Sequence, residues 1–124
     1  MRANHRSDTT PEKRLRSALH ARGLRFRCDL RLDLGHVRVR PDIVFTRRRV
    51  AVFVDGCYWH GCPDHGTLPA SNRGYWIAKI AANRARDRRA DVALAAAGWI
   101  VIRVWEHEDA ELAADSITRT ISAR

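Results

Sequence analysis

Residues 41–56 read PDIVFTRRRVAVFVDG, two short apolar runs separated by a basic tetrapeptide. Short runs rich in β-branched and aromatic residues, bounded by polar residues, are typical of strands, so this stretch predicts a β-hairpin with an arginine-rich turn. Asp42 opens the first strand and Asp55 closes the second. Because a tight turn brings those two strand ends together, we expect both carboxylates at one end of the hairpin.

Two acids that meet at the end of a sheet repel each other unless a cation lies between them. A magnesium site formed by Asp42 and Asp55 is therefore one interpretation, and magnesium there could polarise a phosphodiester and supply a hydroxide nucleophile. The alternative is structural: Asp42 caps a turn after Pro41, and Asp55 pairs with an arginine. Glu12, near the start of a predicted helix, is a third candidate acid, although acids there commonly serve the helix dipole.

The elements around the hairpin predict an α/β fold. We expect a helix from Thr10 to Gly23, strand pieces within 24–39, a long helix from a cap at Ser71 or Asn72 to Gly98, a buried strand at 99–105 and a last helix at 109–122. This order, α-β-β-β-α-β-α, indicates one mixed central sheet flanked by helices. Residues 1–9 are expected to be flexible and 10–124 to form a single domain. Expected core positions include Leu15, Ala18, Leu19, Cys28, Trp76, Ile80, Leu94, Ala97, Leu112, Ile117 and Ile121.

Charge and cysteine content narrow the function. The 124 residues include 23 Lys+Arg and 14 Asp+Glu, giving a formal net charge of +9. Such a balance favours a polyanionic partner, most simply nucleic acid. No run has the length of a membrane span, and the amino-terminal residues lack the apolar core of a secretory signal. Three cysteines cannot all pair, and two of them have the spacing of metal ligands, which favours a reducing cytosol. Together with the basic charge and the lack of a membrane span, this leads us to expect a cytoplasmic, nucleoid-associated protein without a membrane partner.

The segment after the hairpin combines metal ligands with aromatic residues. Three of its side chains have the spacing of zinc ligands: Cys57, Cys62 and His65. His107, after the 99–105 strand, is the preferred fourth ligand because neighbouring strands would end near the same loop. His60 and His36 compete for this place, and the alternative for the two cysteines is a buried apolar pair.

Two adjacent aromatic residues, Tyr58 and Trp59, cannot both face one core. Exposed aromatics beside arginines stack on bases or wedge between base pairs. Trp76, near the start of the long helix, either joins them or packs within the fold. His60 is a candidate general acid or base near neutral pH, as well as a candidate zinc ligand.

Six motifs carry a family resemblance: TPEKRL (10–15), RPDIVF (40–45), GCYWH (56–60), YWIAKI (75–80), NRARDRR (83–89) and GWIVIRVWE (98–106). On these, the chain resembles the very-short-patch repair (Vsr) endonucleases, which nick DNA beside T·G mismatches left by deamination of 5-methylcytosine. The resemblance implies a variant of the restriction-endonuclease-like fold, which agrees with the element order above.

The resemblance also implies roles for matching positions. Asp42 matches a metal-binding aspartate, and Val54 matches a residue whose backbone carbonyl completes that metal site. His60 matches a catalytic histidine, and Glu12 matches an acid near the site. The intercalating aromatics correspond to Tyr58, Trp59 and Trp76. Zinc-ligand positions correspond to Cys57 and His107, while Cys62 and His65 occupy the same loop with the family's alternative spacing.

Two departures from the family pattern stand out. Asp55 occupies the place of a second active-site histidine in the best-known member, where an acid resembles the second metal carboxylate of ordinary restriction-type nucleases. Residues 31–40 replace a shorter connection that usually contains Pro-Gly.

We therefore expect a magnesium-dependent endonuclease that nicks DNA at T·G mismatches, with a structural zinc. The alternatives are a restriction- or defence-associated nicking nuclease and a zinc-stapled DNA-binding module without catalysis. The expected partner is mismatched double-stranded DNA, and mismatch-repair proteins or a cognate cytosine methyltransferase are further candidates; we expect a monomer. Residues nominated for DNA contact are Tyr58, Trp59, Trp76, Lys79, Asn83 and Arg86.

Overall fold

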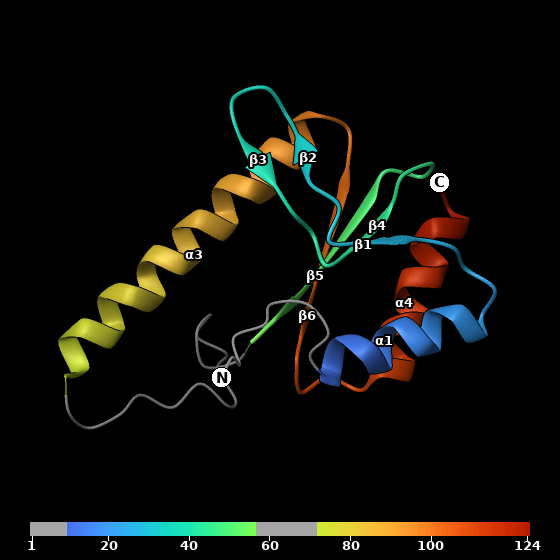
Figure 1. Cartoon of the computed structure of the whole chain (residues 1–124), viewed down its shortest axis with the longest axis horizontal. Coiled ribbons are helices and arrows are strands. Elements are labelled where there is room, and N and C mark those ends of the chain that lie inside the picture. Colours follow the sequence, from blue (N-terminus) through green and yellow to red (C-terminus); the bar gives the residue numbers. More distant parts are fainter. Residues whose placement is uncertain (1–9, 57–71) are drawn as a thin grey trace.

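The computed structural model describes residues 10–56 and 72–124 and shows a mixed α/β architecture (Figure 1). Its helices and strands, in chain order, are α1 (Thr10–Ala21), β1 (Arg27–Cys28), β2 (Leu32–Asp33), β3 (Arg38–Val39), β4 (Ile43–Phe45), β5 (Val50–Asp55), α3 (Arg73–Ala96), β6 (Ile100–Trp105) and α4 (Ala110–Ser122). Within the described residues, no helix combines the length and apolar character needed to cross a bilayer.

The central sheet has four strands in the order β1-β4-β5-β6. The predicted hairpin is confirmed: β4 and β5 are antiparallel, with Ile43 opposite Val52. β6 runs parallel to β5 and places Trp105 beside Asp55, so the sheet is mixed, as expected. β2 and β3 form a separate two-stranded ribbon and do not join this sheet. Asp29 has a φ of 54°, so the extended conformation is interrupted between β1 and β2.

Helices α1 and α4 lie side by side on one face of the sheet (Figure 1). The core between these helices and the sheet is apolar and includes Leu15, Leu19, Ile43, Phe45, Val50, Val52, Val104, Ala114 and Ile117. The carboxyl-terminal half of α3 covers the other face, where Leu94 and Ala90 pack with Ala51, Phe53 and Val101. The amino-terminal turns of α3 extend away from the sheet (Figure 1).

The helix ends follow the sequence signals in most cases. Gly23 and Gly98 follow α1 and α3 with φ values of 80° and 89°, a conformation that glycine adopts at little cost. Asp109 caps α4 by accepting hydrogen bonds from the backbone N–H groups of Glu111 and Leu112. Asn72 stands at the N-cap position of α3, but its φ is 56° and its side chain makes no capping hydrogen bond.

Three core predictions are wrong. Cys28 is exposed because β1 is a two-residue edge strand, whose preceding residues Leu24 and Phe26 reach the core instead. Ala97 is exposed because it lies beyond the last turn of α3. Leu112 is 69% exposed, since the buried stripe of α4 runs through Ala113, Ala114, Ile117 and Ile121.

Candidate active site

The start of β4 and the end of β5 hold Asp42 in place. The backbone N–H of Asp42 donates to the carbonyl of Val52 at 3.0 Å, which extends the hairpin ladder. The N–H of Val54 donates to Oδ2 of the Asp42 side chain at 2.6 Å. One carboxylate oxygen is therefore fixed by the main chain of the neighbouring strand.

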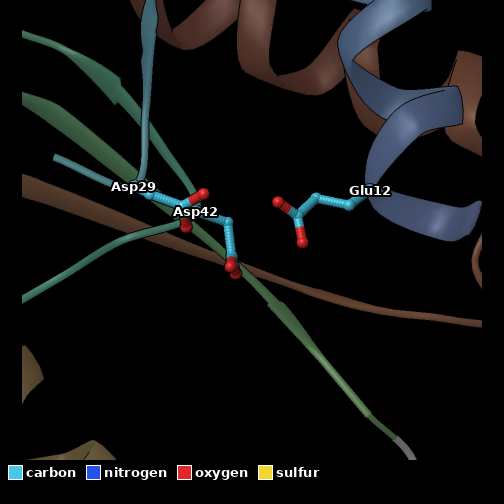
Figure 2. Close-up of side chains that lie close together, drawn as sticks. All are labelled: Glu12, Asp29 and Asp42. Carbon is cyan, nitrogen blue, oxygen red and sulfur yellow. The ribbon is translucent and has the colours of Figure 1, made fainter. Parts of the chain in front are cut away.

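Three carboxylates converge at this end of the sheet. Figure 2 shows the side chain of Glu12 extending from α1 toward Asp29 and Asp42. One oxygen from each of the three residues lies within 4.8 Å of the other two. Glu12 and Asp42 were both predicted site residues, and the structure brings them together from elements thirty positions apart.

Glu12 lies on the buried side of α1, on the same stripe as Leu15 and Leu19. It is only 2% exposed, and Nη1 of Arg16 contacts its Oε2 at 3.2 Å. A buried carboxylate is costly unless a partner compensates its charge. An interaction with the helix dipole alone would not require Glu12 to be buried at the end of the sheet.

Asp29 is the member of this group that sequence reasoning missed. Its positive φ is tolerated by aspartate better than by most residues. Its backbone N–H donates to the carbonyl of Asp42 at 3.2 Å, which holds the β1–β2 connection against the start of β4. The spacing of residues 24–34 gives no sign of this contact, because it depends on where the chain leaves β1.

The electrostatic setting of Asp42 is unfavourable to a bare negative charge. Burial raises the pKa of Asp42 to about 6, and the negative charges of Asp29 and Asp55 add to this effect. The hydrogen bond from Val54 and the charge of Arg103 act in the opposite direction. A cation held among these oxygens would relieve the repulsion, and carboxylate oxygens are the donors that magnesium prefers. The residues present therefore fit a magnesium ion.

Asp55 pairs with an arginine in the structure, whereas the meeting of the hairpin ends suggested a metal site. Its two carboxylate oxygens accept from Nη1 of Arg103 at 3.0 and 3.2 Å. The described residues whose carboxylates converge are Glu12, Asp29 and Asp42, and Asp55 is not among them. The arginine pairing raised as the alternative for Asp55 is thus present, and direct metal binding by this residue stays a prediction.

Six predicted site residues lie outside the described residues: Cys57, Tyr58, Trp59, His60, Cys62 and His65. His107 lies in the exposed turn after β6. The parallel pairing of β5 and β6 brings that turn close to Gly56, because the N–H of Glu106 donates to the carbonyl of Asp55 at 2.9 Å. His36, a competitor for the zinc role, lies between β2 and β3.

The nominated DNA-contact residues of α3 recur at intervals of three and four, which places them on one side of the helix. Lys79 and Arg86 are exposed, whereas Trp76 is half-buried and packs edge-to-face with Tyr75. Asn83 is buried and accepts from Nη1 of Arg86 at 3.3 Å. The two charged members of the set are thus the ones best exposed for contact with phosphate.

Comparison with known proteins decides the family. The family model for DNA mismatch endonuclease Vsr matches residues 1–64, which include all three converging carboxylates. The chain belongs to the Vsr family. As a Vsr-family member, it is a DNA endonuclease.

Named relatives extend over most of this Vsr-family chain. It is 53% identical over 122 residues to the type II nicking enzyme V.NaeI of Lentzea aerocolonigenes, covering 98% of this chain and 74% of the relative. It is 52% identical over 108 residues to the type II nicking enzyme V.XorIIP of Xanthomonas oryzae pv. oryzae, covering 86% and 76%. It is 40% identical over 109 residues to the DNA mismatch endonuclease Vsr of Escherichia coli (strain K12), covering 86% and 66%.

Proposed function

We propose that this Vsr-family endonuclease nicks double-stranded DNA at T·G mismatches, using a divalent metal held at the end of β4 and β5. The observation that supports the metal site is the convergence of Glu12, Asp29 and Asp42. The mismatch target is supported by similarity to the Escherichia coli relative named DNA mismatch endonuclease.

Asp42 is the proposed anchor of the metal. Because its Oδ2 already accepts from Val54, we expect Oδ1 to be the metal-ligating oxygen. Glu12 and Asp29 supply further negative charge, and the backbone carbonyl of Val54 is the proposed fourth contributor. A bound magnesium ion would polarise the scissile phosphodiester and acidify an attacking water.

The remaining roles belong to the protein's own groups. His60 is the proposed acid or base that moves a proton during attack on the phosphodiester. Lys79 and Arg86, exposed on α3, are the proposed phosphate contacts, and Asn83 helps to orient Arg86 through their 3.3 Å hydrogen bond. Tyr58, Trp59 and Trp76 are proposed to wedge beside the mismatch, where unstacking costs least.

Zinc is proposed as a second, structural metal. Its ligands would be Cys57, Cys62, His65 and His107, and their thiolate and imidazole donors suit zinc in a closed tetrahedral site. The carboxyl ends of the parallel strands β5 and β6 lie side by side, and this supports His107 as the ligand from outside residues 57–65. Zinc and magnesium would thus occupy sites with different donors.

A second candidate target is matched or modified DNA, as expected for a nicking enzyme attached to a restriction or defence system. The relatives named type II nicking enzymes support this possibility, since their names state nicking and do not mention a mismatch. Mismatch-repair proteins and a cognate cytosine methyltransferase stay proposed partners. The third interpretation, a DNA-binding module without catalysis, is disfavoured by membership of an endonuclease family.

A metal titration tests the proposed chemistry. The substrate is a duplex with one T·G pair and a labelled strand, incubated with excess protein and increasing magnesium. We expect a single nick whose rate saturates with magnesium and disappears without it, whereas calcium should support binding but not nicking. Equal nicking in the absence of any divalent ion would contradict the metal-dependent mechanism.

A further inference from the structure

Arg103, in the middle of β6, joins the end of β5 to the long helix α3. Its Nη1 contacts both carboxylate oxygens of Asp55 at 3.0 and 3.2 Å. Its Nε and Nη2 donate to Oδ1 of Asp91 at 3.0 and 2.8 Å. The carboxylate of Asp87 lies 3.7 Å from Nη1, and the backbone carbonyl of Asp87 lies 3.4 Å from Nη2. One guanidinium thus engages three acidic residues from two elements.

The surroundings of Arg103 hold this guanidinium in one orientation. Arg103 is the register neighbour of Phe53 on the parallel strand, and its guanidinium carbon lies 4.1 Å from the centre of the Phe53 ring. The side chains of Arg103 and Asp55 are 21% and 10% exposed, so solvent screens this pair less than a surface ion pair. The planar guanidinium binds two carboxylates and stacks on a ring at the same time. The ammonium group of lysine cannot reproduce this geometry.

Arg103 joins the strand that positions the proposed metal-binding carboxylate to the helix that carries the proposed DNA contacts. β5 carries Val54, whose N–H fixes Asp42, and Asp55 directly follows it. α3 carries the exposed phosphate contacts Lys79 and Arg86, and its amino-terminal turns extend away from the sheet (Figure 1). A rigid connection to the carboxyl-terminal half of α3 would therefore set where DNA held by this helix lies relative to the carboxylates.

We propose that Arg103 is a positioning residue for nicking, which fixes α3 against the Asp42 end of β5. Asp55 is then the anchor of this connection on the strand, and Asp87 and Asp91 are its anchors on the helix. This role rests on the proposed function, because it matters only if α3 holds the DNA that the carboxylates cut. It assigns to Asp55 a task that needs no direct contact with metal.

The variant Arg103→Lys tests this role because it keeps the positive charge near Asp42 and loses the planar fork. Arg22→Lys is the matched control. Arg22 also joins two elements through carboxylates, since it contacts Asp115 at 2.8 Å and Glu111 at 3.0 Å. These contacts tie the end of α1 to α4, away from α3.

Three measurements on both variants separate positioning from general stability. In Arg103→Lys, the single-turnover nicking rate at saturating DNA should fall by about tenfold to a hundredfold, the cost of a slightly misplaced substrate. Its affinity for the same duplex should stay within about threefold, because the phosphate contacts remain. Backbone amides of residues 87–91 should exchange hydrogen faster than in wild type. Arg22→Lys should nick at the wild-type rate with unchanged exchange in that segment.

A second variant covers the case in which Arg103→Lys does not fold. Asp91→Asn weakens the shorter of the two helix-side contacts of Arg103 and leaves the Asp87 contact in place. It should show a loss of rate in the same direction with retained affinity, while Asp91→Glu should restore part of the rate. Wild-type nicking by a folded Arg103→Lys or Asp91→Asn protein would overturn the positioning role and leave the proposed function intact. A wild-type protein that nicks no DNA with magnesium would refute the proposed function, and the positioning role with it.

Discussion

The backbone N–H of Val54 donates a 2.6 Å hydrogen bond to Oδ2 of Asp42 across the two strands of the hairpin. Because of this bond, the pairing of the two strands fixes the orientation of the carboxylate that is proposed to anchor the metal. The side chain at position 54 contributes to packing on the α1–α4 face instead. The bond explains how a short hairpin can fix the orientation of this carboxylate through its main chain.

Asp42→Asn should abolish nicking while DNA binding survives. The amide keeps an oxygen for the Val54 N–H but removes the charge that anchors a divalent metal, so we expect a loss of at least about a hundredfold in single-turnover rate. The basic contacts to phosphate are untouched, so the affinity for duplex DNA should change little. Asp33→Asn is the control, because Asp33 is an exposed residue of the β2–β3 ribbon. Near wild-type nicking by Asp42→Asn would rule out the anchoring role.

Asp29→Asn should weaken metal binding. Asp29 is the third carboxylate of the converging group, and losing one charged oxygen from such a site should lower the affinity for magnesium or manganese by about tenfold. Isothermal titration with manganese measures this in the absence of DNA, again with Asp33→Asn as the control. If Asp29→Asn binds manganese as tightly as wild type, Asp29 is not a ligand.

The pKa of Asp42 predicts a specific dependence of stability on pH without added metal. Because burial raises this pKa from 3.8 to about 6, the folded chain binds more protons than the unfolded chain between these values. The contribution of Asp42 to the free energy of unfolding is therefore fully present below pH 3.8 and is lost as the pH rises through 6. Magnesium should reverse this loss, since it favours the ionised carboxylate.

Urea unfolding of wild type and Asp42→Asn at a series of pH values measures this contribution. The free energy of unfolding of wild type, relative to the variant, should fall between pH 4 and pH 6. Taking the difference between the two proteins removes the titration of groups that do not interact with Asp42. A difference that stays constant with pH would show that Asp42 titrates at its ordinary value.

The sequence and the structure agree best where periodicity controls the fold. The hairpin, the three helices and the 99–105 strand are local patterns, and each lies close to its predicted bounds. The partners of the hairpin acids were less predictable, because they come from distant segments. Asp42 meets Glu12 and Asp29 through the packing of α1 and the path after β1, while Asp55 meets an arginine 48 residues further along the chain. Residue spacing contains no information about such contacts.

Zinc should be structural and present at one ion per chain. Cys57→Ser and Cys62→Ser should each lose zinc and fail to fold stably, because a closed structural site contributes directly to folding. Cys28→Ser is the matched control, since Cys28 is exposed and lies in the edge strand β1. Elemental analysis and thermal unfolding of the three variants give the readout. A folded wild-type protein without zinc would contradict the assignment.

Single-turnover nicking of paired T·G and T·A duplexes in magnesium, by wild type and Trp59→Ala, tests the proposed function most directly. Unstacking costs a few kcal/mol and least at a mismatched pair, so an aromatic wedge should itself favour the T·G duplex. Wild type should nick the T·G duplex at least about a hundredfold faster, and Trp59→Ala should lose most of that rate and part of the preference. Equal nicking of both duplexes by wild type would contradict the mismatch role and favour nicking of matched DNA.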